Sequence, residues 1–184
     1  INEIAEYIVS EGKGILAADE SNPTCGKRFD SIGVESSEEN RRDYRELLFR
    51  SDGMVGNIGG VILFDETIRQ NAADGTSLVD LISSQGALPG IKVDKGLQQM
   101  DDSEESLTQG LDGLDERLKE YFALGARFTK WRAVINIGMG LPSSEAISAN
   151  MEALADYAKI VQNNNMVPMV EPEVLMEGDH SIDA

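Results

Sequence analysis

Short apolar runs rich in β-branched residues alternate with amphipathic segments along the whole chain, and this alternation limits the folds open to it. The runs are brief, as buried strands are, whereas the segments between them carry apolar residues at helical spacing. We predict five strands, at residues 14–18, 60–64, 90–93, 127–134 and 167–170.

Four helices are predicted between these strands. Ser36 and Glu39 have the spacing of a capping box, which predicts a helix that runs to about Arg50. Apolar residues recur on one face of the other segments, which we place at 77–84, 111–122 and 147–161. The apolar face of the third is predicted to consist of Ile147, Met151, Leu154, Ala158 and Val161. Strands and helices that alternate in this way predict a parallel sheet built from βα units.

Charged residues stand two positions apart near the C-terminal ends of the later strands. The pairs are Lys92 with Asp94, Lys130 with Arg132, and Glu171 with Glu173, while Asp19 and Glu20 follow the first strand directly. Strand side chains alternate between the two faces, so both members of each pair point to the same side.

These charges decide between the two architectures that five βα units can form. In a doubly wound sheet both faces are covered by helices, and each buried charge would cost several kcal/mol. In a closed (β/α)8 barrel the same charges converge on a polar mouth, so they favour an α/β fold of the TIM-barrel type. Such a barrel takes about 250 residues. Residues 1–184 are therefore expected to form the N-terminal part of one barrel domain, with about its first five strands.

Composition excludes several classes of partner and site. The chain has 16 Lys plus Arg against 33 Asp plus Glu and a formal net charge of -17, which argues against nucleic acid as a partner. A single cysteine, Cys25, and a single histidine, His180, leave no intramolecular disulfide and argue against the usual zinc sites. No apolar run approaches the ~18 residues of a membrane span. The acidic run at 101–105 is predicted to be a solvated loop rather than a calcium site.

The strand-end residues combine acids, amines and a guanidinium, and they suit an anionic substrate such as a sugar phosphate. Breaking a carbon–carbon bond next to a carbonyl needs an electron sink, either a divalent metal or a protonated imine on lysine. A single histidine disfavours the metal, so no metal and no cofactor are predicted.

Eight stretches of the chain resemble, in order, the motifs of class I fructose-bisphosphate aldolases. They are GKGILAADES (12–21), KRFDSIG (27–33), ENRRDYRELL (39–48), GGVILFDET (59–67), GIKVDKG (90–96), QGLDGL (109–114), KWR (130–132) and VPMVEPE (167–173). The segment at 20–28 is most similar to the plant, algal and related bacterial members.

The resemblance implies a barrel enzyme, commonly a homotetramer, that reversibly cleaves fructose 1,6-bisphosphate to dihydroxyacetone phosphate and glyceraldehyde 3-phosphate. It implies a place in glycolysis, gluconeogenesis or the Calvin cycle, in the cytoplasm or, after removal of a transit peptide, in the plastid stroma. The reaction would proceed through a Schiff base on a lysine of the sixth strand, which lies beyond Ala184.

By motif, four residues resemble the family's catalytic groups. Asp19 resembles the carboxylate that takes the C4 hydroxyl proton, and Lys130 the lysine that stabilises charge beside the Schiff base. Glu171 resembles the acid and base of carbinolamine formation and dehydration, and Glu173 its charge-balancing neighbour. We expect Glu173 to favour a protonated Glu171, and Lys130 with Lys92 to hold Asp19 ionised.

Three further residues, Arg41, Lys92 and Arg132, resemble substrate-binding positions. Two alternatives stay open: a non-catalytic, aldolase-like interaction protein, and another sugar-phosphate barrel enzyme such as an isomerase.

Overall fold

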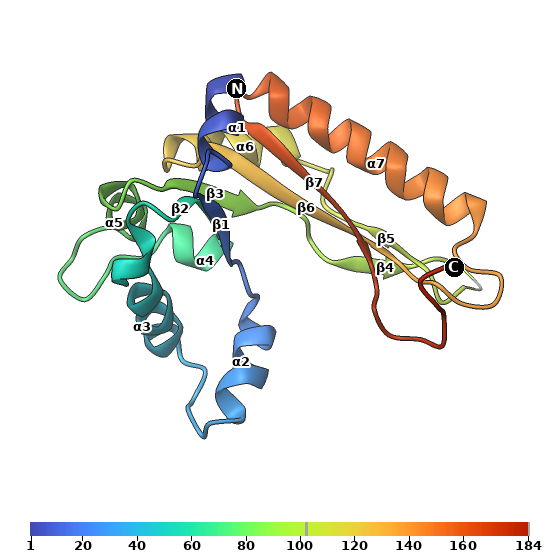
Figure 1. The fold of residues 1–184 in the computed structure, drawn as a ribbon, viewed down its shortest axis with the longest axis horizontal. Helices are drawn as coiled ribbons and strands as arrows, with labels where there is room; N and C mark the ends of the chain where they lie inside the picture. Colours follow the sequence, from blue (N-terminus) through green and yellow to red (C-terminus); the bar gives the residue numbers. More distant parts are fainter. Residues whose placement is uncertain (102, 184) are drawn as a thin grey trace.

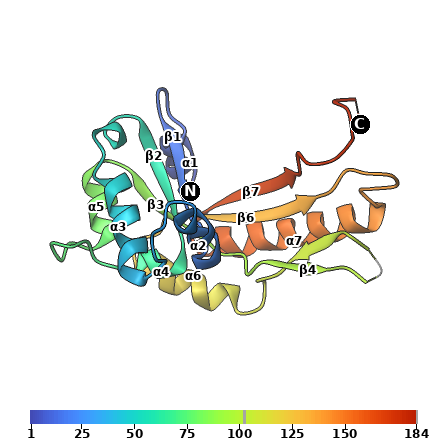
Figure 2. The same ribbon diagram turned by 90° about the horizontal axis from the view of Figure 1, so that it is seen from below.

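The protein is built on a five-stranded parallel sheet, with strand order β1-β2-β3-β6-β7 (Figure 1). The structure is a computed structural model and describes residues 1–101 and 103–183. The strands are β1 Gly14–Ala18, β2 Ile58–Leu63, β3 Leu88–Lys92, β6 Phe128–Ile135 and β7 Val167–Val174. A separate antiparallel hairpin joins β4 Leu97–Gln99 to β5 Ser106–Thr108. Seen from below, β1 and β2 stand almost across β6 and β7, so the sheet is strongly twisted (Figure 2).

One helix precedes the first strand of the parallel sheet, and the others lie between successive strands. The helices are α1 Asn2–Ile8, α2 Asn22–Asp30, α3 Glu38–Phe49, α4 Asp65–Ile68, α5 Leu78–Ser84, α6 Leu114–Ala123 and α7 Ser144–Asn163, with a 3-10 turn at Asp52–Met54. None of the described helices combines the length and the apolar character needed to cross a membrane.

The five predicted strands are confirmed, and all four pairings between neighbours in the sheet are parallel. β7 extends four residues past its predicted end, because it pairs with β6 over its full length, up to Val174 opposite Ile135. Glu171 and Glu173 therefore lie within the strand rather than after it.

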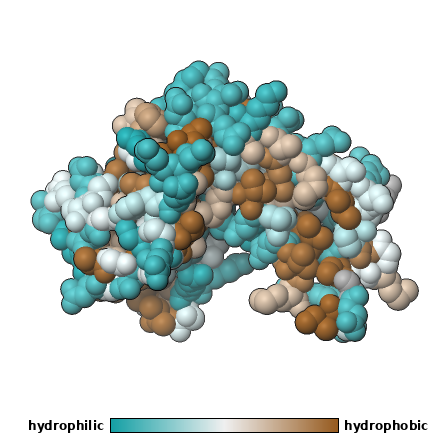
Figure 3. All heavy atoms as spheres, turned by 45° about the horizontal axis from the view of Figure 1, so that its top comes forward, coloured by the Kyte–Doolittle hydropathy of each residue, from teal (hydrophilic) through white to brown (hydrophobic). Residues whose placement is uncertain are grey.

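Three helix predictions were wrong in detail. The helix predicted at 111–122 is α6, which begins only at Leu114. The N-cap of α3 is Ser37, whose hydroxyl accepts from the Asn40 N–H at 3.1 Å, because the helix begins one residue later than the capping box at Ser36 predicts. On α7, Ile147 and Met151 are exposed, since the helix turns a neighbouring face to the sheet. That buried face consists of Ala146, Asn150, Ala153, Leu154, Tyr157 and Val161. Hydrophobic side chains open to solvent stand between hydrophilic ones on the right of Figure 3, the half in which α7 lies.

The outer face of β6 packs against α7. Trp131 is fully buried, and its ring centroid lies 5.3 Å from that of Tyr157. The Tyr157 hydroxyl also lies 2.6 Å from the hydroxyl of Thr129, so the polar end of this ring is satisfied inside the core. These contacts fix which side of β6 faces the helices, and Lys130 must then point to the other side.

The inner face of the sheet is apolar at its N-terminal end. Ile8 from α1, Ile62 and Phe128 form a small buried cluster there. The Phe128 ring lies directly over two strand glycines: a Cβ built on Gly60 would approach it to 2.9 Å, and one on Gly90 to 2.3 Å. Only residues without a side chain allow this ring to fill the space inside the sheet.

We expect Gly90→Ala to destabilise the intact protein by about 1–3 kcal/mol, because the new methyl group overlaps the Phe128 ring. Gly14→Ala is the matched control, since its methyl group meets nothing within 4 Å. Denaturant unfolding of both variants measures the difference. Adding Phe128→Leu to the Gly90→Ala protein should restore part of the lost stability, whereas Phe128→Leu alone should not stabilise the protein. Equal stability of Gly90→Ala and Gly14→Ala would contradict the overlap with the Phe128 ring.

Candidate active site

The inner face of β6 changes from apolar to charged along the strand. Phe128 is fully buried, the next inward side chain, Lys130, is 12% exposed, and Arg132 is 43% exposed. Polarity and access to solvent thus increase together toward the C-terminal end of the strand. This end is where βα barrels carry their chemistry.

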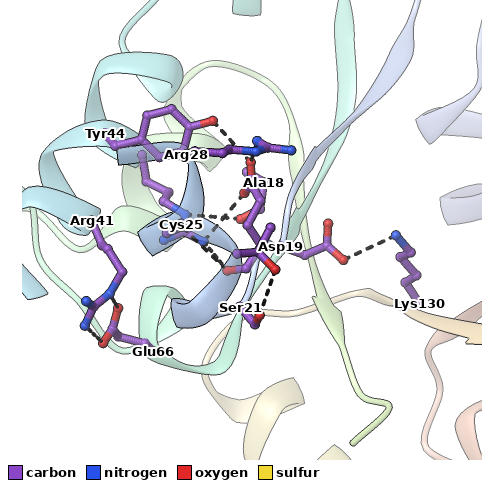
Figure 4. A network of polar contacts seen from close by, with 12 residues as sticks. Ala18, Asp19, Ser21, Cys25, Arg28, Arg41, Tyr44, Glu66 and Lys130 are labelled. Carbon is purple, nitrogen blue, oxygen red and sulfur yellow. Dashed lines mark hydrogen bonds and ion pairs between the residues drawn. The ribbon is translucent and has the colours of Figure 1, made fainter. Parts of the chain in front are cut away.

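The Lys130 amine lies between two carboxylates from opposite edges of the sheet. Its Nζ is 3.3 Å from Asp19 Oδ2, just after β1, and 3.1 Å from Glu171 Oε2 in β7. Two strands, β2 and β3, separate β1 from β6 in the sheet, so the contact with Asp19 crosses the concave inner side (Figure 4). The sheet is therefore curled as part of a barrel, which confirms the expected architecture.

Opposing effects act on the pKa of Lys130. Burial lowers the pKa of this amine, whereas the charge of Asp19 and the hydrogen bond to Glu171 raise it. The two carboxylates prevail, and the pKa of Lys130 lies above its ordinary 10.5. Lys130 is therefore a fixed positive charge at neutral pH rather than a free-amine nucleophile.

A second ion pair lies further toward the strand ends. Arg132 Nε is 3.0 Å from Glu173 Oε2, and both side chains are about 40% exposed. The negative charge of Glu173 is thus paired with the positive charge of Arg132, a partner that the expectation of Glu173 acting on Glu171 did not include. Of the two amines expected to face Asp19, Lys130 does so and is shared with Glu171, whereas Lys92 pairs with Asp94 instead.

Lys92 stands beside Lys130 in the register of β3 and β6. Its Nζ is 3.8 Å from Asp94 Oδ1, and its side chain is one-quarter exposed. It also lines a cleft of about 680 Å³ between the strand ends and α6, together with Lys95 and Tyr121. An amine that is both paired and accessible can bind an anion from this cleft.

Arg41 is not brought to the Lys130 group. Its guanidinium donates to both oxygens of Glu66, at 2.8 and 2.7 Å, and to the Ser36 hydroxyl at 3.2 Å. The hydrogen bond from Arg41 holds the pKa of Glu66 below its usual range. Figure 4 places this pair apart from Asp19 and Lys130. A substrate contact for Arg41 stays a prediction, and here its guanidinium binds Glu66 and Ser36.

Sequence reasoning missed two buried charges. Arg45 is fully buried on the face of α3 that also carries Arg41 and Phe49, and the i, i+4, i+8 spacing of the three was the available signal. Glu105 belongs to the acidic run predicted to be solvated, of which residue 102 lies outside the described residues.

That prediction is wrong for Glu105, which is 5% exposed and accepts from the Ser143 N–H at 2.8 Å and the Ser143 hydroxyl at 2.6 Å. The bond from Ser143 lowers the pKa of Glu105. The carboxylate thereby ties the hairpin to the start of α7, where the helix dipole favours negative charge.

Within residues 1–101 and 103–183, no group of three or more His, Cys, Asp or Glu side chains is arranged to hold a metal ion. The inner face of the sheet offers carboxylates, amines and a guanidinium in ion pairs. Such a set can move protons and bind anions.

Residues 1–184 match the family model of class-I fructose-bisphosphate aldolase. The chain is 54% identical over 182 residues to a probable fructose-bisphosphate aldolase class 1 of Xanthomonas campestris pv. campestris. That alignment covers 98% of the chain and 54% of the relative. It is 55% identical over 179 residues to the cytosolic fructose-bisphosphate aldolase 6 of Arabidopsis thaliana, covering 97% of the chain and 50% of that relative.

A chloroplastic fructose-bisphosphate aldolase 1 of Chlamydomonas reinhardtii is 55% identical over 180 residues, covering 97% of the chain and 48% of that protein. In a solved structure, the Plasmodium falciparum fructose-bisphosphate aldolase in complex with TRAP and a small-molecule inhibitor aligns with a TM-score of 0.96 at 50% identity, over 98% of this chain and 53% of that one. The chain spans about half the length of the relatives it matches.

The raised pKa of Lys130 gives a pH dependence with a definite sign. Its ion pairs stabilise the fold from neutral pH up to about 10.5, and the contribution is lost as the pH rises through the raised pKa. We expect Lys130→Met to lower the free energy of unfolding of the intact protein by about 1–3 kcal/mol at pH 8. The difference from wild type should shrink above pH 10.5. Lys159→Met, at an exposed lysine of α7, is the control, and a difference that grows with pH would contradict the assignment.

Proposed function

Because the chain belongs to the class I fructose-bisphosphate aldolase family, we propose that the intact protein is a lyase that reversibly cleaves fructose 1,6-bisphosphate to dihydroxyacetone phosphate and glyceraldehyde 3-phosphate. The observation that carries the proposal is the Lys130 amine held between Asp19 and Glu171 on the inner side of the curled sheet. Residues 1–184 are the N-terminal part of the single barrel domain in this proposal.

The proposed nucleophile is a lysine outside residues 1–184, on the strand that follows β7 in the barrel. A residue on the inner face of that strand would lie beside Glu171. Its amine attacks the substrate ketone, and the resulting carbinolamine must lose water to become an imine. Glu171 is 39% exposed, so it can donate the proton that leaves with the hydroxyl group and release the water to solvent.

Asp19 has the opposite task in the proposed cycle. Its side chain is 11% exposed, and its Oδ2 lies 3.3 Å from the Lys130 amine on the inner side of the sheet, where it can accept a proton from the substrate. When Asp19 takes the proton of the C4 hydroxyl, the C3–C4 bond breaks and its electron pair flows into the protonated imine. The aldehyde product departs, and an enamine remains to be protonated.

The positive charges of Lys92 and Arg132 suit the phosphate groups of this substrate. Both are partly exposed, and each is paired with a single carboxylate that a phosphate can compete with. We further propose a homotetramer, and a cytoplasmic or plastid stromal location, since the relatives include cytosolic and chloroplastic proteins.

Borohydride reduction in the presence of dihydroxyacetone phosphate should trap a covalent adduct on the intact protein, and EDTA should leave cleavage unchanged. Mass spectrometry of the adduct and a coupled cleavage assay provide the measurements. Chelator-sensitive cleavage without an adduct would contradict the Schiff base. The absence of both adduct and cleavage would favour the alternative of a non-catalytic, aldolase-like interaction protein. Analysis of the products would distinguish the other alternative, an isomerase.

The two carboxylates should differ in the step that each one serves. We expect Glu171→Gln to slow adduct formation and Asp19→Asn to slow carbon–carbon cleavage, each by about 10²- to 10⁴-fold, the range for positioned acids and bases. Glu152→Gln, an exposed carboxylate on α7, is the matched control. Adduct formation at the wild-type rate in Glu171→Gln, or normal cleavage in Asp19→Asn, would refute the assigned role.

A further inference from the structure

Arg45 is buried more deeply than any other charged residue in the described part of the chain. Its side chain, on α3, has no exposed surface. A buried guanidinium is costly unless it is paired and hydrogen-bonded, and an apolar side chain of similar volume often stabilises a fold as well or better. The presence of an arginine here therefore calls for a specific use of its donors.

Those donors hold the backbone on either side of Asp19. Arg45 Nη2 donates to the carbonyl of Glu20 at 2.6 Å, and Nε donates to the carbonyl of Ala18 at 3.3 Å. One planar group thus spans the residue before and the residue after Asp19. The guanidinium is rigid, so it fixes these two carbonyls relative to each other.

The sheet does not supply this support. The pairing of β1 with β2 ends at Ala18 opposite Leu63, and Asp19 lies one residue beyond. In an extended chain Asp19 points to the side opposite its two neighbours. Holding the carbonyls of Ala18 and Glu20 from α3 therefore sets the direction in which the Asp19 carboxylate leaves the chain, toward Lys130 (Figure 4).

The charge of Arg45 is balanced within the same cluster. The carboxylate of Glu20 lies 3.6 Å from Arg45 Nη2, accepts from the Tyr44 hydroxyl at 3.1 Å and pairs with Arg28. Arg28 belongs to α2, and Tyr44 precedes Arg45 on α3. The cluster therefore joins both helices to the end of β1, and Arg45 is its only member that contacts the backbone on both sides of Asp19.

We propose that Arg45 is a positioning residue that holds Asp19 in the geometry needed to take a proton from the substrate. The inference rests on the role proposed above for Asp19. Arg45 itself lies on the outer side of β1 and does not touch the reacting atoms. Misplacing a catalytic group by about 1 Å costs on the order of 10²-fold in rate, so the loss of this clamp should be visible in turnover.

The kinetic test compares Arg45→Lys and Arg45→Gln with Arg42→Gln, a more exposed arginine of the same helix, in the intact protein. We expect both Arg45 variants to lower kcat for cleavage by about 10²-fold and to change KM by less than about threefold. On the Asp19→Asn background Arg45→Lys should cost less than about threefold more, because the group that it positions is gone. The proposal would be overturned if the double variant lost kcat by the product of the losses in Arg45→Lys and Asp19→Asn. It would also be overturned if kcat for Arg45→Lys were near that of Arg42→Gln.

Hydrogen exchange tests the positioning without reference to activity. Arg45→Lys should speed amide exchange in the peptide covering residues 16–21 by about tenfold and leave residues 153–161 of α7 unchanged. Unchanged exchange at 16–21, or an equal increase in both peptides, would overturn the proposal, as would failure of both variants to fold. A different result is a wild-type protein that forms no borohydride adduct while Arg45→Lys raises exchange at 16–21 alone. That result would refute the proposed function but support the role of Arg45 in holding the backbone around Asp19.

Discussion

The contact of Lys130 with both Asp19 and Glu171 is the interaction on which the arrangement of the site depends. It joins the residue after one edge strand to a residue within the other, across the inner side of the sheet. A flat sheet could not bring β1 and β6 into contact with β2 and β3 between them. The position of one amine between two carboxylates is therefore a direct consequence of the curvature.

The curvature in turn depends on what fills the inner side below Lys130. Phe128, one inward position earlier on the same strand, occupies the space that Gly60 and Gly90 leave free. On the outer side Trp131 packs against Tyr157 of α7. Large side chains on alternate faces of β6 thus hold the strand from both sides, and Lys130 lies between these positions with little freedom to move.

Asp19 is held differently, because it lies beyond the last pairing of its strand. Lys130 faces its carboxylate, while Arg45 binds the backbone on either side of it from the opposite direction. Membership of the aldolase family is established for the whole length of the chain. Within that family likeness, the contacts show how two arginines of one helix are used: Arg41 binds Glu66, and Arg45 holds the end of β1.

Local pattern in the sequence determined the five strands and their parallel direction, because strands and helices alternate along the chain. It also determined that Lys130 and Arg132 share a face, because side chains alternate with a period of two along any strand. It also placed the charged residues at one end of the sheet. Only the tertiary structure decided that Lys130 serves both Asp19 and Glu171, that Arg41 binds Glu66, and that Arg45 and Glu105 are buried. These partners are far apart in the chain, and their distances depend on how the sheet curls and how helices pack on it. No local periodicity encodes that geometry.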